Sequence, residues 1–272
     1  MLGDPIAHSL SPVLHRAGYA ELGLDWSYDA HRVPAGGLAA FVDGLGGEWR
    51  GLSLTMPLKR EALAVADRLT DRARLAGAVN TLLLDEQGGE RVGDNTDLPG
   101  AVAAIRERTT VPLASAAILG GGATASSIGL ALVDLGVRSV ELLVRDEARA
   151  AETLEVLRAH PAGVEVRTGR LAATPAIAAD IVVSTIPAAA QTAELVARCD
   201  GVPVVFEALY DPWPTPLAAS VLAGSDDRTL VGGLDLLVHQ AALQLDLFTG
   251  LRAPLEAMRQ AGRRALAERS AG

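Results

Sequence analysis

The chain has 272 residues, of which 49% are apolar and 21% charged, as in soluble globular proteins of one large or two ordinary domains. A net charge of −9 and the lack of any Lys/Arg-rich run argue against nucleic-acid binding. The single cysteine excludes an intrachain disulfide and a cysteine-based metal site, and no apolar run is long enough to span a membrane. We therefore expect a cytoplasmic protein without a membrane partner.

The N-terminal part begins with a very short strand, if any, because Met1 leads directly into Leu2-Gly3-Asp4-Pro5; this suggests a late start of the chain. A helical pattern follows over 13–24, with Ser11 as the expected N-cap and Pro12 as its first residue. Alternation and flanking turn residues then predict a strand over 26–33, a helix over 37–45 and a strand over 50–55.

Lys59 is the only lysine among 24 basic residues, all the others being arginine. It follows Pro57, which ends the 50–55 strand, so it is expected at a strand-to-helix corner, where functional groups are common. Lysine can exchange its proton in a suitable environment, whereas arginine stays protonated. Lys59 is therefore a candidate catalytic residue. The alternative is a solvated lysine that the arginine-rich composition has spared.

Asn80 and Asn95 are the only two asparagines of the chain, and each precedes a threonine at an expected strand end. An amide side chain both donates and accepts hydrogen bonds, which suits recognition of a polar ligand. The alternative is that both lie in turns, where asparagine is favoured because it bonds to the local backbone.

From residue 98 onward, apolar strands alternate with helices. Strands are predicted over 116–119, 139–144, 164–167, 181–184 and 202–206, with helices between them. A proline-rich loop over 211–216, a strand ending at Val231, and helices over 234–249 and 254–268 complete the chain. This alternation predicts a parallel, doubly wound sheet.

Gly120-Gly121-Gly122, followed by Ala123, lies between a predicted strand and a helix. Such a turn lets a phosphate approach backbone N–H groups at a helix N-terminus. The match to the G-x-G-x-x-G pattern of dinucleotide-binding folds is imperfect, because Ala125 replaces the third glycine.

The next strand ends at Arg145, with Arg149 one helical turn further, where NAD-binding folds normally place an acid. Arginine suits a 2′-phosphate through charge-assisted contacts, so the sequence predicts NADP as the cofactor. Asp146 is an adjacent acid that would blunt this preference if it paired with Arg145. The alternative is a solvated, charged helix start.

These separated motifs together resemble the shikimate dehydrogenase family, NADP-linked enzymes that reduce 3-dehydroshikimate in aromatic amino-acid biosynthesis. The resemblance covers essentially the whole chain, with matching segments at 3–12, 51–59, 77–81, 94–97, 120–123, 210–217 and 233–240. It implies two domains: an α/β substrate-binding domain over 1–98 completed by C-terminal helices over 235–272, and a Rossmann-like NADP-binding domain over 99–234. The substrate is expected in the cleft between them.

The resemblance also implies a role for individual residues. Lys59 and Asp97 match the catalytic pair, Asp97 contacting substrate as well. The residues that match substrate binders are Ser9, Ser11 and Tyr210 for the carboxylate, and Thr55, Asn80 and Gln240 for the ring hydroxyls. The residues that match cofactor binders are Gly120, Gly121, Gly122 and Ala123 for the diphosphate, Arg145 and Arg149 for the adenosine phosphate, and Asp71, Ala208 and Gly233 near the nicotinamide.

The chain departs from the family pattern at several positions. Ser53 replaces the usual Asn, Leu98-Pro99 follows Asp97 in place of small residues, and Glu207 stands where Asp is common. Val144 and Asp146 replace the usual neighbours of Arg145, which concerns cofactor affinity more than the reaction.

The residue types account for the expected chemistry. Reducing a ring ketone leaves an alkoxide, which an ammonium can stabilise and protonate; in the reverse direction the amine accepts the proton. Neutral hydroxyls and amides then reject analogues that lack a hydroxyl. The five histidines are too scattered to suggest a metal site, and we expect no metal.

Two alternatives remain open. One is a quinate/shikimate dehydrogenase that uses NAD, although Ser9, Ser11 and Arg145 point away from it. The other is a non-catalytic paralogue that senses the ligand, which would be expected to have a damaged Lys59/Asp97 pair or an added regulatory domain. The expected partner is the small-molecule substrate, and the chain is expected to be a monomer or a homodimer.

Overall fold

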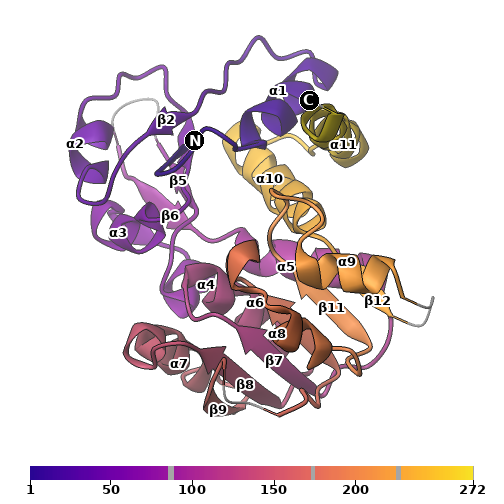
Figure 1. Cartoon of the computed structure of the whole chain (residues 1–272). Helices are drawn as coiled ribbons and strands as arrows, with labels where there is room; N and C mark the ends of the chain where they lie inside the picture. Colours follow the sequence, from indigo (N-terminus) through magenta and orange to yellow (C-terminus); the bar gives the residue numbers. More distant parts are fainter. Residues whose placement is uncertain (85–88, 173–174, 225–227, 272) are drawn as a thin grey trace. The chain divides into compact units, whose positions relative to one another are not determined.

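The computed structural model describes residues 1–84, 89–172, 175–224 and 228–271 (Figure 1). The chain divides into two compact units, one formed by Met1–Gly100 with Leu237–Gly272 and the other by Ala101–Leu236. The chain passes between the units within two helices, α5 (Asp97–Arg108) and α10 (Gly233–Thr249).

The first unit is built on a four-stranded sheet of order β3-β5-β6-β4. Its strands are β3 (Gly51–Ser53), β4 (Arg68–Leu69), β5 (Thr81–Leu83) and β6 (Val92–Asp94). β5 pairs antiparallel with β3 and with β6, whereas β4 and β6 are parallel. β1 (Leu2–Gly3) and β2 (His31–Arg32) form a separate parallel pair, and a bridge joins Leu2 to Leu54. The strand predicted over 26–33 is therefore only two residues long.

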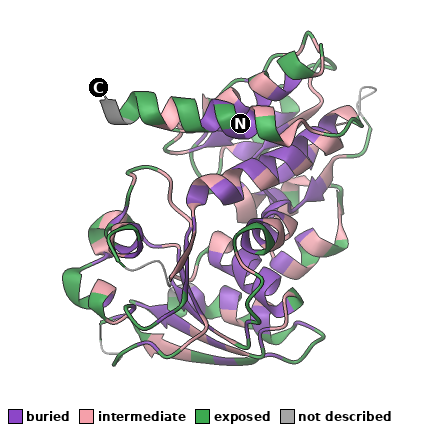
Figure 2. Cartoon of the chain, turned by 90° about the vertical axis from the view of Figure 1, so that its right-hand side faces the viewer, coloured by how far each residue is buried: buried purple, intermediate pink, exposed green. Residues whose placement is uncertain are grey.

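Helices complete this unit, and some of them bury apolar side chains of its sheet. Besides α10 and the start of α5, they are α1 (Ser11–Glu21), α2 (Leu38–Asp43), α3 (Leu58–Val65), α4 (Asp71–Ala76) and α11 (Leu255–Ala271). Leu52 and Leu82 of the sheet pack with Leu38 and Leu58 in one core cluster. α1 packs against α11, which exposes much of its outer side near the C-terminus (Figure 2).

The start of α1 differs from the prediction. The helix begins at Ser11, and Leu10 occupies the N-cap position without a side-chain capping bond. The Ser11 side chain is buried, and its backbone N–H donates to Ser9 Oγ at 3.2 Å. Ser9 therefore supplies the hydroxyl at this helix N-terminus, where backbone N–H groups lack helical partners.

The second unit contains a six-stranded parallel sheet, which confirms the doubly wound fold (Figure 1). In the order β12-β11-β10-β7-β8-β9, the strands are β12 (Thr229–Val231), β11 (Val204–Glu207), β10 (Ile181–Ser184), β7 (Ser115–Leu119), β8 (Ser139–Val144) and β9 (Glu165–Arg170). Strand order runs one way from β7 to β9 and the other way from β10 to β12. The reversal between β7 and β10 is a topological switch point, where such sheets bind ligands.

Helices follow most strands of the second unit as the alternation predicted, but the described residues between β9 and β10 form no helix, so the prediction is wrong at that connection. The helices are α6 (Ala123–Asp134), η1 (Ala148–Ala150), α7 (Ala151–Arg158), η2 (Ala188–Ala190), α8 (Ala193–Ala197) and α9 (Pro216–Leu222). α6 packs against α7, and α8 packs against α9. Gly129 of α6 lies against Ile118 of β7, whereas Leu195 of α8 and Leu217 of α9 share a core cluster with Ala117 and Leu119. Because successive strand residues point to opposite faces, the two helix pairs cover opposite faces of the sheet.

Candidate active site

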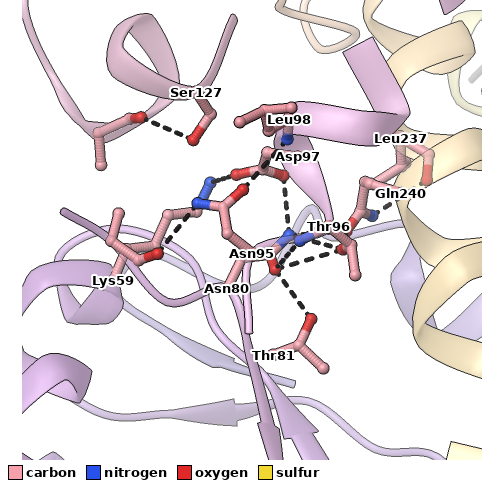
Figure 3. Close-up of polar contacts among 12 residues, drawn as sticks. Lys59, Asn80, Thr81, Asn95, Thr96, Asp97, Leu98, Ser127, Leu237 and Gln240 are labelled. Atoms are coloured by element: carbon pink, nitrogen blue, oxygen red, sulfur yellow. Dashed lines mark hydrogen bonds and ion pairs between the residues drawn. The ribbon is translucent and has the colours of Figure 1, made fainter. Parts of the chain in front are cut away.

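Lys59 and Asp97 form an ion pair within the first unit. Lys59 is the second residue of α3, and Asp97 is the first residue of α5. Lys59 Nζ lies 2.6 Å from Asp97 Oδ2, and the side chains are only 12% and 7% exposed (Figure 3). The N-terminal end of α5 also favours a carboxylate at Asp97. The strand-to-helix corner predicted for Lys59 is thus where the ammonium meets its partner.

Asn80 holds the other oxygen of Asp97. Its Nδ2 donates to Asp97 Oδ1 and to Thr96 Oγ1, both at 2.9 Å. Its Oδ1 accepts from the backbone N–H of Thr96 and from Thr81 Oγ1, both at 2.8 Å (Figure 3). Asn80 is 1% exposed, so these bonds replace those that water would make. Both carboxylate oxygens of Asp97 are therefore fixed by side chains.

Gln240 reaches the same group from α10. Its Oε1 lies 3.3 Å from Asn80 Nδ2, and its Nε2 donates to the backbone oxygen of Leu237 at 3.0 Å (Figure 3). Gly100 makes this approach possible, because a Cβ there would lie 2.9 Å from the backbone nitrogen of Gln240. The helices α5 and α10 can thus pass close enough for Gln240 to contact Asn80.

Asn95 has a different role from Asn80. Its Nδ2 donates to the backbone oxygen of Ala78 at 3.0 Å, and its Oδ1 accepts from the backbone N–H of Leu98 at 3.1 Å. The second bond satisfies an N–H group in the first turn of α5. Asn95 therefore shapes the loop that presents Asp97, which is the turn alternative considered for the two asparagines.

Asp94, the last residue of β6, fixes the start of the same loop. It accepts hydrogen bonds from Thr70 Oγ1, at 2.7 Å, and from two guanidinium nitrogens of Arg72. Burial alone would raise the pKa of Asp94, but the bonds from Arg72 and Thr70 outweigh it and hold the pKa below its usual range. The loop between β6 and α5 therefore starts from a buried ion pair.

The remaining substrate-binding candidates of the first unit lie at the ends of elements. Ser9 is half-buried before α1, and its Oγ donates to Met1 Sδ at 3.2 Å. Ser11 is buried. Thr55 is half-buried after β3, and its backbone N–H donates to Leu2 oxygen at 3.0 Å.

Three further buried polar residues connect to Asn80. Ser53 Oγ accepts from Tyr28 Oη at 2.6 Å and donates to Gln244 Oε1 at 2.8 Å. Gln244 Nε2 donates to the backbone oxygen of Asn80 at 3.0 Å and to Thr81 Oγ1 at 2.9 Å. Tyr28 and Gln244 belong to no recognisable motif, but Gln244 follows Gln240 by one helical turn, a spacing that places both on one face of α10.

The glycine turn of the second unit directly follows β7. Gly120 has φ +108°, a backbone conformation that only glycine adopts readily, and a Cβ there would lie 2.4 Å from Thr185 Oγ1. Gly122 occupies the N-cap position of α6, and Ala123 is the first helical residue. The turn therefore lies beside the end of β10, at the switch point, with the α6 N-terminus following it.

A cavity of about 620 Å³ opens beyond the ends of β8 and β9. Arg145, Arg170 and Arg198 contribute positive charge to its lining, Glu194 contributes a carboxylate, and Leu171 and Leu195 are among its apolar residues. Its volume lies within the range of small-molecule sites. Arg170 is a basic residue that the motif around β8 does not reveal, because it comes from the end of the neighbouring strand.

Arg145 follows β8 with an exposed side chain, and Asp146 accepts a hydrogen bond from the backbone N–H of Ala148 at 3.0 Å. The side chain of Arg149 lies outside the part of the chain that the structure describes. The cavity thus holds one of the two arginines predicted to bind the adenosine phosphate.

The other cofactor candidates are more dispersed. Ala208 and Gly233 lie against each other, since a Cβ on Gly233 would be 2.6 Å from Ala208 oxygen. Tyr210 is half-buried in the loop between β11 and α9. Asp71, in the first unit, is the first residue of α4; its fully exposed side chain pairs with Arg74 at 2.7 Å.

Glu207, at the end of β11, is fully buried and organises the loop that contains Tyr210. It accepts hydrogen bonds from Gln191 Nε2 at 2.7 Å, Thr215 Oγ1 at 2.8 Å and the Leu209 backbone N–H at 3.0 Å. Burial raises the pKa of Glu207, and these bonds oppose that effect only in part.

Within the described residues, no group of three or more His, Cys, Asp and Glu side chains has a metal-binding arrangement. In the same part of the chain, no helix is both long and apolar enough to cross a membrane.

Two family models match the chain. The first, described as the shikimate dehydrogenase substrate binding domain, matches residues 1–82, and the second, the shikimate 5′-dehydrogenase C-terminal domain, matches residues 233–261. The shikimate dehydrogenase (NADP(+)) of Desulfitobacterium hafniense is 33% identical over 273 residues, with 98% of this chain and 97% of that protein covered.

Solved structures extend the similarity to the fold. Shikimate dehydrogenase from Mycobacterium tuberculosis is 41% identical, with 97% of each chain covered and a TM-score of 0.85. Shikimate 5-dehydrogenase from Thermus thermophilus, in complex with NADP(H) and shikimate, is 31% identical, with 97% of each chain covered and a TM-score of 0.80.

Proposed function

The chain belongs to the shikimate dehydrogenase family, and on this premise we propose that it catalyses the NADP-dependent interconversion of shikimate and 3-dehydroshikimate. The observation that carries the proposal is the buried pair of Lys59 and Asp97, which Asn80 and Gln240 extend into one polar group. This group combines a proton-carrying nitrogen with amide and hydroxyl groups, the combination that a polyhydroxylated ring ketone requires.

Lys59 moves the proton in this account. In the reduction direction, its ammonium donates a proton to the oxygen that forms at the ring carbon; in the oxidation direction, the same nitrogen takes the hydroxyl proton. Asp97 holds that nitrogen through Oδ2 at 2.6 Å, so the proton donor stays in one position. A fixed general acid–base group contributes about 10²- to 10⁴-fold to the rate.

The remaining substrate contacts are assigned by chemistry. Asn80, Gln240 and Thr55 would bind ring hydroxyls, because amides and hydroxyls both donate and accept. Ser9 and Ser11, with Tyr210, would donate to the substrate carboxylate. We accordingly propose the region 1–98 with 235–272 as the substrate-binding domain.

The region 99–234 is the proposed NADP-binding domain. Its residues fit a dinucleotide, because Gly120 adopts the conformation of a phosphate-binding turn and arginines line a cavity beside it along the sheet. Gly121, Gly122 and Ala123 complete the turn. When bound, NADP would accept a hydride from the carbon that bears the hydroxyl.

The nucleotide preference follows from the charge at the cavity. Arg145 and Arg170 suit a 2′-phosphate, which NADP has and NAD lacks. Arg149 is proposed as a further contact to this phosphate on the basis of its position in the sequence. Ala208 and Gly233 would face the nicotinamide. Asp71 is proposed to lie near the nicotinamide on the family resemblance alone.

The assay that tests the proposal measures reduction of NADP and of NAD by the purified chain, each with shikimate and with quinate. We expect the highest kcat/KM for shikimate with NADP. Preferred turnover of quinate with NAD would instead support the alternative dehydrogenase. No reduction of either cofactor with either substrate would overturn the proposed function and support a ligand sensor.

A further inference from the structure

Tyr28, Ser53 and Gln244 form a buried polar cluster behind Asn80, and all three are less than a tenth exposed. Tyr28 Oη donates to Ser53 Oγ at 2.6 Å, and Ser53 Oγ donates to Gln244 Oε1 at 2.8 Å. The ring of His15 stacks on Tyr28 with a centroid distance of 4.1 Å. The Tyr28 hydroxyl is therefore held in place, and its proton is committed to Ser53.

The direction of these bonds sets the orientation of Gln244. A serine hydroxyl has one proton, and that of Ser53 is used on Gln244 Oε1. The amide nitrogen of Gln244 consequently faces the other way, toward the Asn80 backbone oxygen and Thr81 Oγ1. Because all these atoms are buried, a reversed amide would leave a donor facing a donor, which is costly.

Thr81 links the Gln244 amide to the Asn80 side chain. Thr81 Oγ1 accepts from Gln244 Nε2, so its single proton goes to Asn80 Oδ1 at 2.8 Å. The Thr96 backbone N–H reaches the same oxygen. With its oxygen held on this side, Asn80 turns its NH₂ group toward Asp97 Oδ1 at 2.9 Å. One chain of donors thus runs from Tyr28 to the carboxylate that holds Lys59.

We propose that Tyr28, Ser53 and Gln244 are positioning residues that orient the Asn80 amide and thereby fix Asp97 against Lys59. The inference rests on the proposed dehydrogenase function for its catalytic consequence. None of the three needs to touch the reacting atoms, because the effect passes through the amide of Asn80.

Ser53→Ala removes the hydroxyl that links the Tyr28 hydroxyl to the Gln244 amide. Gln244 Oε1 loses its donor and Tyr28 Oη its acceptor, so only the bonds to the Asn80 backbone oxygen and to Thr81 Oγ1 still hold the Gln244 amide. A shift of this amide would move Thr81 Oγ1 and weaken its hydrogen bond to Asn80 Oδ1. Because the Thr96 N–H still holds Asn80 Oδ1, the expected loss in kcat is about two- to tenfold, the value of one ordinary hydrogen bond. The KM for NADP should not change.

The kinetic test compares kcat for shikimate oxidation in wild type, Ser53→Ala and Tyr28→Phe. Ser53→Thr keeps the hydroxyl and should restore most of the activity. Tyr19→Phe is the matched control, because Tyr19 is also buried and packs edge-on against the ring of Trp26. In an Asn80→Ala background, Ser53→Ala should have no further effect on kcat, since the group through which it acts is gone.

A spectroscopic test is independent of activity. Because the chain has only two asparagines, protein labelled with ¹⁵N-asparagine gives two side-chain amide pairs, and the Asn80→Ala variant identifies which belongs to Asn80. Ser53→Ala should shift the Asn80 pair and leave that of Asn95 in place.

The outcomes separate this inference from the proposed function. An unchanged Asn80 signal in Ser53→Ala overturns the inference, whatever the activity. A shifted signal with unchanged kcat in an active enzyme overturns its catalytic part. If wild type does not oxidise shikimate, the proposed function fails, and the Asn80 signal still decides whether the cluster orients the amide.

Discussion

Lys59 Nζ lies 2.6 Å from Asp97 Oδ2, and neither side chain is more than an eighth exposed. Such a pair is held together at a cost, because each charge has lost most of its hydration. A nearly buried ion pair therefore contributes little to the free energy of unfolding. Because Lys59 is also the only lysine of the chain, its burial beside a carboxylate points to a functional role.

The two asparagines should respond differently to substitution. Asn80→Ala removes a donor from Asp97, so kcat/KM for shikimate should fall about tenfold or more, because a bond to a charged group is lost. Asn95→Ala removes backbone contacts at Ala78 and Leu98, so it should lower the midpoint of thermal unfolding. Kinetics and thermal melts of both variants test the distinction; similar losses of catalytic efficiency without any loss of stability would contradict it.

Arginine substitutions at the cavity should discriminate between the two cofactors. Arg145→Ala and Arg170→Ala are each expected to raise the KM for NADP about tenfold or more, because a charge-assisted bond to the 2′-phosphate is lost. The KM for NAD should change little. Arg138→Ala is the matched control, because Arg138 is exposed at the opposite, N-terminal end of β8. Equal changes for NADP and NAD would show that these arginines do not recognise the 2′-phosphate.

His15 should make stability depend on pH. Burial lowers the pKa of His15 to about 3 from its ordinary 6.5, against a smaller opposing effect of Gln244. Below pH 6.5 the unfolded chain binds a proton that the folded chain does not, so the free energy of unfolding falls as pH decreases toward 3. The contribution is about 1.4 kcal/mol per pH unit.

Denaturant unfolding of wild type and His15→Phe from pH 7 to pH 4 checks this prediction. Phenylalanine keeps a ring against Tyr28 but carries no titrating group. The wild-type curve should fall more steeply below pH 6.5, and parallel curves would contradict a neutral, buried His15.

The doubly wound sheet was predictable because its central strands β7, β10 and β11 are buried and read as mainly apolar runs. The predicted bounds of β8 and β10 match the structure at both ends, whereas the edge strand β9 is partly exposed. The two-residue length of β2 and the existence of β4 were not predictable, because their pairing depends on partners far away in the sequence. Pro12 correctly indicated the start of α1, but the identity of the cap depends on where the Ser9 hydroxyl lies.

The site was predictable where a scarce residue marked it, as with Lys59 and Asn80, and where the family pattern supplied a match. Tyr28 and Gln244 had no such mark, because burial and hydrogen-bond direction belong to the folded state. Ser53 was visible only as a departure from that pattern. The structure accounts for a hydroxyl at this position. Ser53 Oγ accepts a hydrogen bond from Tyr28 and donates its one proton to Gln244 Oε1, so both neighbours have a partner.

The most direct measurement is kcat for shikimate oxidation with NADP by Lys59→Ala and Lys59→Arg, beside Asp97→Ala and wild type. We expect each variant to lose about 10²- to 10⁴-fold in kcat, because alanine removes the proton carrier and arginine keeps the charge without releasing a proton. Circular dichroism melts establish that each variant is folded. A folded Lys59→Arg or Lys59→Ala with kcat within about twofold of wild type would contradict the assignment of Lys59 as the group that moves the proton.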